Sequence, residues 1–248
     1  MPSHSRHGFT LIEFSIVLVI IGLLVGGVLA GKALIQQAEI RAAASKLQQF
    51  ETAYRIFQTK YNCIVGDCPY ATDLFGTNYY SDTHGCSHPN GNGNGDGDGV
   101  IKGYAGWAGS CWATESEQAA RSLFMAGFLP NSSYDSTSLG FIGTNDVRGY
   151  FYNDDLYGNA LPATSNNAVT FYSKLTGLPT IAFASISSVQ ARLIDEKIDD
   201  GLPTKGKFRG LDSKTIGNPN NILANSCSTS GVYNLNEDFT CRSLYYFK

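Results

Sequence analysis

The sequence lacks the short motifs that carry common enzymatic chemistry. It contains no G-x-S-x-G nucleophile elbow, no H-E-x-x-H zinc motif and no complete P-loop. Asp195, Glu196, Asp199 and Asp200 cluster in sequence, but no nucleophile, base or oxyanion motif accompanies them, which favours a solvated helix face over acid–base work. An exported enzyme on a membrane anchor is disfavoured for the same reason. We therefore expect a protein that is not an enzyme.

Positive charge is sparse and scattered. The chain has 18 basic and 21 acidic residues, a net charge of −3, and its only tight basic group is Lys205, Lys207 and Arg209. Proteins that bind nucleic acids carry a basic patch or stripe on one face. We therefore do not expect nucleic acid among the partners.

Histidine is also rare, which limits zinc chemistry. His84 and His88 flank Cys86 in an arrangement that imitates a zinc site, but no second cysteine lies nearby. All six cysteines follow Asn62, and their even number suits disulfides in an oxidising compartment. Pairing by proximity, one of the 15 connectivities that six cysteines allow, predicts three bonds: Cys63–Cys68, Cys86–Cys111 and Cys227–Cys241.

One apolar segment near the N-terminus is long enough to cross a bilayer. Residues 9–30 contain Glu13 as their only charge, and a transmembrane helix needs about 20 apolar residues. A secretory signal peptide is the alternative, because Arg6 makes a weak basic n-region and Val28-Leu29-Ala30 resembles a cleavage site. However, the run exceeds the roughly 7–15 residues of an ordinary h-region, and an export signal has no use for a costly carboxylate. These features favour a membrane anchor.

The helical pattern continues beyond this segment. No proline or glycine occurs from Lys32 to Asn62, and side chains on alternating steps of three and four residues form one seam. Residues 9–61 therefore predict one long helix, with a transmembrane half at 9–30 and an amphipathic half at 31–61. The seam consists of Ala33, Gln36, Ile40, Ala43, Leu47, Phe50, Tyr54, Phe57 and Tyr61.

Beyond Asn62 the composition shifts to Gly, Asn, Ser, Thr and Tyr, which predicts an exported globular head at residues 62–248. The short runs GYFYN, AVTFYS, TIAFASI and SLYYF are typical of strands. The expected fold class is α+β, with the long N-terminal helix packed on an antiparallel sheet.

Two further helices in the head are predicted from capping boxes. The boxes are Thr114 with Glu117, and Ser187 with Gln190. Gly127 and Gly201 follow the two helical patterns and are expected to end them, because glycine accepts the left-handed backbone of a helix stop.

The start of the apolar segment carries a specific pattern. Gly8 is followed by Phe9-Thr10-Leu11-Ile12-Glu13 and then by the apolar run. This resembles the type IV pilins and the pseudopilins of type II secretion, over roughly residues 6–61. The resemblance implies that residues 1–8 are a leader, removed after Gly8 by a prepilin peptidase on the cytoplasmic side. It also implies methylation of the new amino terminus at Phe9.

The same resemblance implies a role for Glu13 and for one disulfide. In this family the glutamate is thought to meet the N-terminal amine of a neighbouring subunit, so Glu13 would set the register during filament assembly. The spacings Gly22–Gly26 and Gly27–Gly31 permit close helix approach. The Cys227–Cys241 pair resembles the C-terminal disulfide loop of many pilins.

The function implied is that of a structural subunit of a type IV pilus or related filament. Before assembly it would be a single-pass inner-membrane protein with its head in the periplasm, and later part of an extracellular filament. Its partners would be other pilin subunits, the prepilin peptidase and inner-membrane assembly machinery.

An alternative assignment is a low-abundance tip subunit, minor pilin or pseudopilin whose large head binds a surface or a secretion substrate. Aromatic clusters at residues 149–152 and 245–247 could form a glycan-binding face, although such residues are more often sheet core. Many major pilins have a proline where Ala30 falls here, and pseudopilins often lack it. The motif therefore does not separate a pilus from a competence filament or a secretion pseudopilus.

The glycine-rich stretch NGNGNGDGDGVI predicts a Ca²⁺ site in the head. Asn94, Asp96 and Asp98 stand at alternate positions and Val100 offers a carbonyl, as in the first half of an EF-hand loop. Ile101 is expected to point into the head. Position 12 of the pattern is Ala105 instead of a glutamate, so further ligands would come from Asn92 or water. The alternative is a flexible loop without metal.

Overall fold

The computed structural model describes residues 10–76, 94–101, 115–129, 147–153, 167–173, 186–212, 214–215, 218–222, 227–236 and 239–247. The chain divides into two compact units. The first ends at Glu39, and the second, here called the head unit, runs from Ile40 to Lys248. The boundary falls inside the first helix, so the C-terminal part of that helix folds together with the head.

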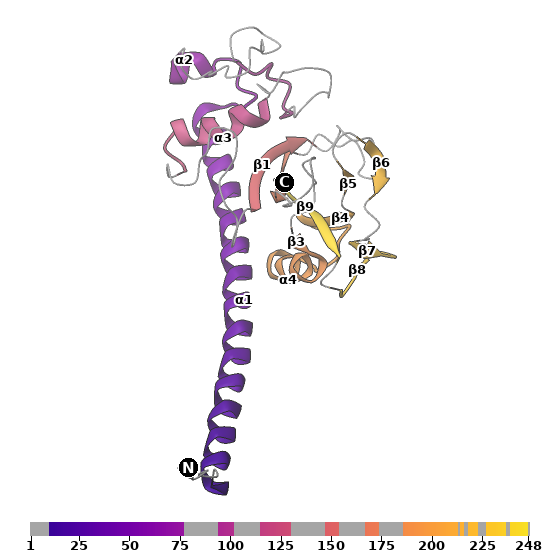
Figure 1. Cartoon of the computed structure of the whole chain (residues 1–248). Helices are drawn as coiled ribbons and strands as arrows, with labels where there is room; N and C mark the ends of the chain where they lie inside the picture. The colour runs from indigo at the N-terminus through magenta and orange to yellow at the C-terminus, as the bar shows by residue number, and fades with distance from the viewer. Residues whose placement is uncertain are drawn as a thin grey trace, which may run out of the picture. The chain divides into compact units, whose positions relative to one another are not determined.

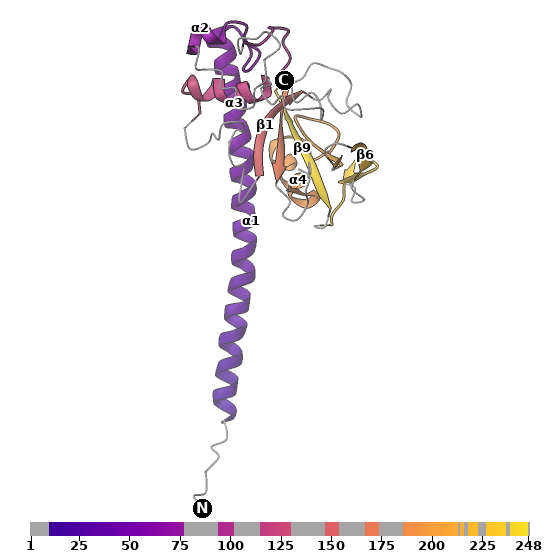
Figure 2. The same ribbon diagram turned by 45° about the horizontal axis from the view of Figure 1, so that its top comes forward.

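Helix α1 runs without interruption from Leu11 to Tyr61 (Figures 1 and 2). This confirms the predicted long helix, which is about 75 Å long at about 1.5 Å per residue. Its hydrogen-bond ladder is unbroken because the sequence supplies no proline along its length. The helix ends at Tyr61, and Asn62 follows it with a φ of 49°, in the left-handed region that asparagine tolerates better than most residues.

The head unit contains a five-stranded antiparallel sheet with β9 at its centre. Strand β9 pairs with β2, β3 and β4, and β2 pairs in turn with β1. In this register Phe208 of β4 lies opposite Tyr245 of β9. The strands are β1 (Val147–Asn153), β2 (Asn167–Ser173), β3 (Ile186–Ser187), β4 (Phe208–Asp212) and β9 (Thr240–Tyr246).

Two small hairpins and three helices complete the described part of the head unit. The hairpins are β5 (Lys214–Thr215) with β6 (Asn218–Ile222), and β7 (Ser228–Thr229) with β8 (Val232–Tyr233). The helices are α2 (Ala71–Phe75), α3 (Glu115–Met125) and α4 (Ser188–Ile198). The sequence did not predict α2, which is a single short turn. Of the predicted strand TIAFASI, only Ile186 lies within the described residues.

The predicted capping box at the start of α4 is present. The backbone N–H of Gln190 donates to Ser187 Oγ at 3.2 Å, and that of Ser187 donates to Gln190 Oε1 at 3.2 Å. The helix ends at Ile198, and Gly201 follows with a φ of 69°. Helix α3 is followed by Gly127 at a φ of 74°. Thr114, the predicted cap of α3, lies outside the described residues.

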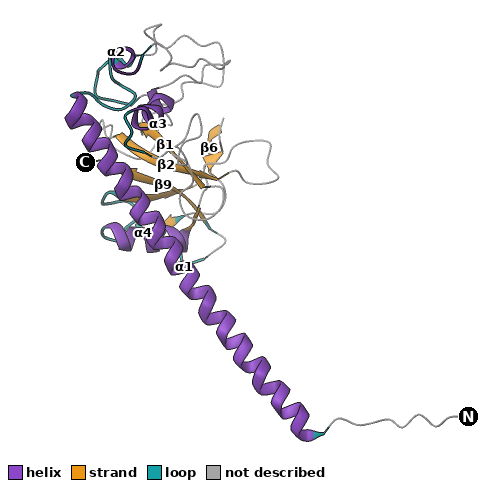
Figure 3. Ribbon diagram, turned by 90° about the vertical axis from the view of Figure 1, so that its left-hand side faces the viewer, coloured by secondary structure: helices purple, strands orange, loops and turns teal. Residues whose placement is uncertain are grey.

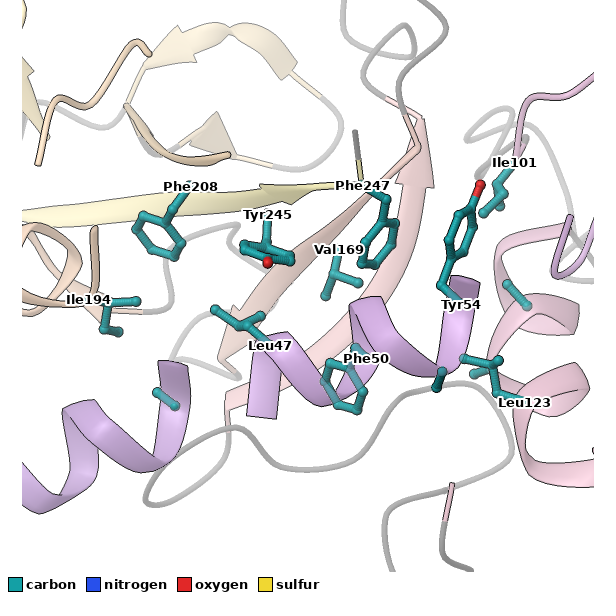
Figure 4. Close-up of a cluster of buried hydrophobic side chains, with 14 of the residues drawn as sticks. Leu47, Phe50, Tyr54, Ile101, Leu123, Val169, Ile194, Phe208, Tyr245 and Phe247 are labelled. Carbon is teal, nitrogen blue, oxygen red and sulfur yellow. The ribbon is translucent and has the colours of Figure 1, made fainter. Parts of the chain in front are cut away.

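The hydrophobic core of the head unit forms between the second part of α1 and the sheet. Figure 3 shows this part of the helix crossing strands β1, β2 and β9. Figure 4 shows Leu47 and Tyr54 pointing toward the sheet, where Tyr245 lies. The ring of Tyr54 stacks on that of Phe247 at 4.7 Å between centroids. The predicted seam is therefore confirmed from Ile40 onward.

The N-terminal end of the predicted seam is not part of this core. Ala33 is exposed and Gln36 only half-buried, and both belong to the first unit. The seam begins to be buried at Ile40 because the sheet and helices that cover it all belong to the head unit.

Two of the three predicted disulfides are present in the described residues. Cys63 is bonded to Cys68, and Cys227 to Cys241. The first closes the turn after α1, and the second joins the start of the β7–β8 hairpin to β9. The predicted Cys86–Cys111 bond lies outside the described residues.

Candidate functional site

Thr10 and Glu13 form a reciprocal capping box at the start of α1. The backbone N–H and the hydroxyl of Thr10 donate to Glu13 Oε2 at 2.8 and 2.7 Å. In return, the backbone N–H of Glu13 donates to Thr10 Oγ1 at 3.3 Å. A Thr and a Glu three residues later are the pattern for this arrangement. The carboxylate of Glu13 therefore has hydrogen-bond partners within its own chain.

This cap explains how a carboxylate is tolerated at the start of an apolar helix. A charge in hydrocarbon costs free energy, and both the donors of Thr10 and the positive end of the helix dipole offset part of that cost. The sequence interpretation assigned Glu13 only to a contact between subunits. It missed the cap, although the letters TLIE contain its signature. Gly8 and Phe9, the predicted cleavage and methylation residues, lie outside the described residues.

Behind this cap, α1 exposes apolar side chains on all sides. Every residue from 11 to 30 is exposed, with Leu23 at 72% and Leu11 at 89%. Length and composition make α1 the one helix in the described residues that could cross a membrane. A Cβ atom added at Gly22, Gly26 or Gly27 would meet nothing within 4 Å. Small residues on such a surface allow another helix to approach closely.

A second candidate site lies in the head unit, where Asp67 holds the glycine-rich loop. The backbone N–H of Gly97 donates to Asp67 Oδ1 at 2.6 Å, and that of Gly99 donates to Oδ2 at 2.7 Å. Both glycines have positive φ angles, 77° and 89°, which other residues adopt only at a cost. Asp67 precedes Cys68, whose disulfide to Cys63 constrains the turn.

Asp67 also belongs to a group of three carboxylates. Carboxylate oxygens of Asp67, Asp96 and Glu115 lie within 4.8 Å of one another. Asp67 and Glu115 are buried, each 2% exposed. Burial raises the pKa of Asp67, the charges of Asp98 and Asp96 add to this, and the N–H groups of the loop oppose it. Carboxylate oxygens are the ligands that Ca²⁺ prefers, so this group has the chemistry to hold a hard cation.

Of the four residues predicted to bind calcium, only Asp96 belongs to this carboxylate group. Asn94 Oδ1 accepts a hydrogen bond from the backbone N–H of Thr72 at 2.8 Å, and Asp98 Oδ1 accepts one from Val100 at 2.9 Å. The carboxylate group contains Asp96 but not Asp98. Ile101 is fully buried, as predicted. Calcium binding itself stays a prediction.

The sequence interpretation missed Asp67 and Glu115. They lie in the turn after α1 and at the start of α3, far along the chain from the glycine-rich stretch. No local pattern marks either residue, because only the fold brings their segments together.

The predicted solvated acidic face is correct for Glu196, Asp199 and Asp200, which are exposed, and wrong for Asp195. Glu196 does lie at the surface, where it accepts a hydrogen bond from Arg192 at 2.7 Å. Asp195, in contrast, is fully buried. It follows Ala191 by four residues and so lies on the helix face that packs against the core. Tyr233 supplies the hydrogen bond that makes this burial possible, at 2.8 Å.

A polar network joins α1 to the sheet inside the head unit. Lys207 Nζ lies 2.9 and 3.1 Å from the two carboxylate oxygens of Glu51, and the Tyr245 hydroxyl donates to Glu51 Oε2 at 2.5 Å. Arg55 pairs with the same carboxylate at 2.8 Å. Burial would raise the pKa of Glu51, but the hydrogen bonds from these three groups outweigh it and lower the pKa.

Comparison with protein families matches residues 3–29 to the prokaryotic N-terminal methylation motif. The matched segment covers the Gly8–Phe9 junction, the Thr10–Glu13 cap and most of the exposed apolar part of α1. Searches of curated proteins and of solved structures found no match. The match lies wholly before the head unit, which begins at Ile40.

Proposed function

We propose that this chain, a type IV pilin-like or pseudopilin-like protein by the methylation motif that is the hallmark of those proteins, is a structural filament subunit. The observation that carries the proposal is the exposed apolar surface of residues 11–30, in which the capped Glu13 is the only charge. Such a surface is stable in the hydrocarbon of a membrane or against other helices of the same kind. Membrane anchoring and filament assembly provide these environments in turn.

Processing precedes assembly. A prepilin peptidase cleaves between Gly8 and Phe9, and the new N-terminus at Phe9 is methylated. Support comes from the motif, which spans this junction. N-terminal sequencing of the mature protein is expected to begin at Phe9. A mature chain that began at Gly31 would instead show that the apolar segment is a cleaved signal peptide.

After cleavage, Glu13 sets the register between subunits. Its Oε2 already accepts two hydrogen bonds from Thr10, but an ionised carboxylate has about four acceptor positions. Glu13 can therefore keep its cap and also receive the N-terminal amine of a neighbouring subunit. Such pairing neutralises both charges inside the apolar environment.

The head is exported to the periplasm before assembly and lies on the outside of the filament afterwards. The Cys63–Cys68 and Cys227–Cys241 bonds support this location, because disulfides persist in oxidising compartments. Inner-membrane assembly machinery and other pilin subunits are the partners. The role is structural and requires no active site.

Immunogold labelling of sheared filaments with an antibody to the head tests this function. Labelling along the whole length is expected for a structural subunit. Labelling only at filament ends would assign the chain to the tip, where the head would act as a binding module. If the mature protein remained entirely in the membrane fraction while filaments formed without it, the filament role would be wrong.

A further inference from the structure

Asp195 is a buried carboxyl group at the last turn of α4. The Tyr233 hydroxyl donates to its Oδ2 at 2.8 Å, and the backbone N–H of Gly201 donates to its Oδ1 at 3.2 Å. Tyr233 comes from the β7–β8 hairpin, which contacts α4 (Figure 1). It reaches Asp195 across Gly210 of β4, where an added Cβ would lie 2.3 Å from the tyrosine ring. Three chain segments therefore meet at this one side chain.

A second carboxyl group, that of Asp199, lies within 4.8 Å of the first. Its Oδ2 accepts hydrogen bonds from the backbone N–H groups of Lys207 and, at 3.1 Å, of Phe208. Gly206 allows this approach, because a Cβ there would lie 2.1 Å from the same oxygen. Asp199 therefore fastens the start of β4 to the end of α4.

Two carboxyl groups this close, one of them fully buried, share one proton, because ionising both would place two negative charges together. Burial, the hydrogen bond to Asp199 and the charge of Asp199 raise the pKa of Asp195 to about 8, against the opposing effect of the hydrogen bonds from Tyr233 and Gly201. Burial acts in the same direction on Asp199, but hydrogen bonds from Asp195 and from the N–H groups of Phe208, Asp200 and Lys207 outweigh it and lower its pKa. At neutral pH the proton therefore resides on Asp195.

The other titratable groups around the pair have defined partners. Burial and the charge of Asp195 raise the pKa of Tyr233, so it stays a hydrogen-bond donor. On the α1 side the Lys207 ammonium and the Tyr245 hydroxyl both bind Glu51. Asp200 accepts a hydrogen bond from Leu202, and on the outer face of α4 Arg192 binds Glu196.

We propose that the Asp195–Asp199 pair is a proton-linked latch, which fastens residues 199–208 and the β7–β8 hairpin to the end of α4 and opens by releasing one proton. In the open state Asp195 is solvated and has the ordinary pKa of an aspartate, about 4. The closed state thus holds a proton that the open state does not between about pH 4 and pH 8. The latch is tightest below this range and weakens as pH rises through it.

One consequence is a loosening of the head unit toward alkaline pH. Opening frees the residues before β4, among them Lys207, whose ammonium pairs with Glu51 of α1. The equilibrium constant for opening should rise about tenfold per pH unit, because each opening event releases one proton. Above about pH 8 both states are deprotonated, and the constant should reach a plateau.

Hydrogen exchange of the full chain in detergent micelles, followed by mass spectrometry, tests the latch. After correction for the intrinsic pH dependence of exchange, peptides covering 199–208 and 228–235 should open about 100-fold more readily at pH 7.5 than at pH 5.5. Peptides from residues 40–61 should keep their protection, which distinguishes local opening from unfolding. An equilibrium constant for opening that did not change with pH in the wild type would refute the proposal.

Matched variants assign the effect to the pair. Asp195→Asn keeps the size of the side chain and a hydrogen-bond donor for Asp199 but has no ionisable proton. Its equilibrium constant for opening should therefore not change with pH. Glu196→Gln changes the adjacent exposed carboxylate and should follow the wild type. Tyr233→Phe removes a hydrogen-bond donor that lowers the pKa of Asp195. In this variant the equilibrium constant for opening should therefore reach its plateau at a higher pH. A wild-type profile in Asp195→Asn, or an unmoved plateau in Tyr233→Phe, would overturn the latch.

Discussion

Helix α1 belongs to both the first unit and the head unit, but its side chains are mostly exposed in the first and partly buried in the second. From Leu11 to Ala30, α1 is apolar on all sides and exposed, as Leu23 illustrates at 72%. After Ile40 only one face is apolar, and Leu47 and Phe50 on that face are 1% and 0% exposed. The backbone is helical in both parts. The second part is therefore stabilised by packing within its own chain, whereas the exposed apolar surface of the first part suits a membrane.

The largest expected effect separates the charge of Glu13 from its cap. Glu13→Gln keeps the capping box, since Gln also serves at this position, but removes the charge. We expect normal membrane insertion and a loss of filaments, measured by membrane fractionation and by the yield of sheared filaments. Normal filaments from this variant would show that Glu13 acts only within its own helix.

Thr10→Ala is the matched control for that variant. It removes the hydroxyl of the cap and keeps the charge, at a cost of about 1 kcal/mol to the helix start. Filaments should still form. If Thr10→Ala lost filaments as fully as Glu13→Gln, capping and not charge would be the function of this site.

Two large-to-small substitutions compare the two parts of α1 directly. Phe50→Ala leaves a cavity in the head unit and should lower its free energy of unfolding by about 3–5 kcal/mol. Leu23→Ala, in the exposed part of the same helix, should leave that free energy unchanged. Urea unfolding of the full chain in micelles, followed by near-ultraviolet circular dichroism, measures both. Equal losses would contradict the division at Glu39 and Ile40.

Removal of the Cys227–Cys241 bond should weaken the head unit alone. The bond closes a loop with a sequence separation of 14, for which the chain-entropy model gives about 3 kcal/mol. The double variant Cys227→Ala with Cys241→Ala should therefore unfold at a lower temperature while its membrane insertion is unchanged. Peptide mapping without reduction gives the connectivity, and a link from Cys227 to another cysteine would refute the pairing.

The smallest expected effect is stabilisation of the head unit by calcium. At a Ca²⁺ concentration ten times the dissociation constant, a single site adds about 1.4 kcal/mol. Titration of the full chain to millimolar Ca²⁺ should raise its melting temperature. Asp67→Asn should abolish this response because Asp67 lies in the carboxylate group, whereas Asp98→Asn should retain it. Loss of the response in Asp98→Asn but not in Asp67→Asn would favour the predicted EF-hand-like ligands. If the wild type did not respond to Ca²⁺ either, calcium binding would be excluded.

Features set by neighbours along the chain were predictable from the sequence. The length of α1, the Ser187–Gln190 box and two proximity disulfides all depend on residues close in sequence. The four predicted strand segments follow from the same kind of signal, and their described residues lie in strands except Phe247, which follows β9. The Thr10–Glu13 cap is equally local, since its two residues are three apart, but the sequence interpretation did not include it.

That α1 is one helix follows from local sequence alone, because backbone hydrogen bonding and side-chain periodicity repeat within a few residues. Which side chains of the head unit share a site depends, in contrast, on how distant segments fold together. Asp67 meets Gly97 and Gly99 of another segment, and Asp195 meets Tyr233 of a distant hairpin. A buried carboxyl group needs hydrogen-bond donors that its own segment supplies only in part, so its partners depend on how distant segments pack.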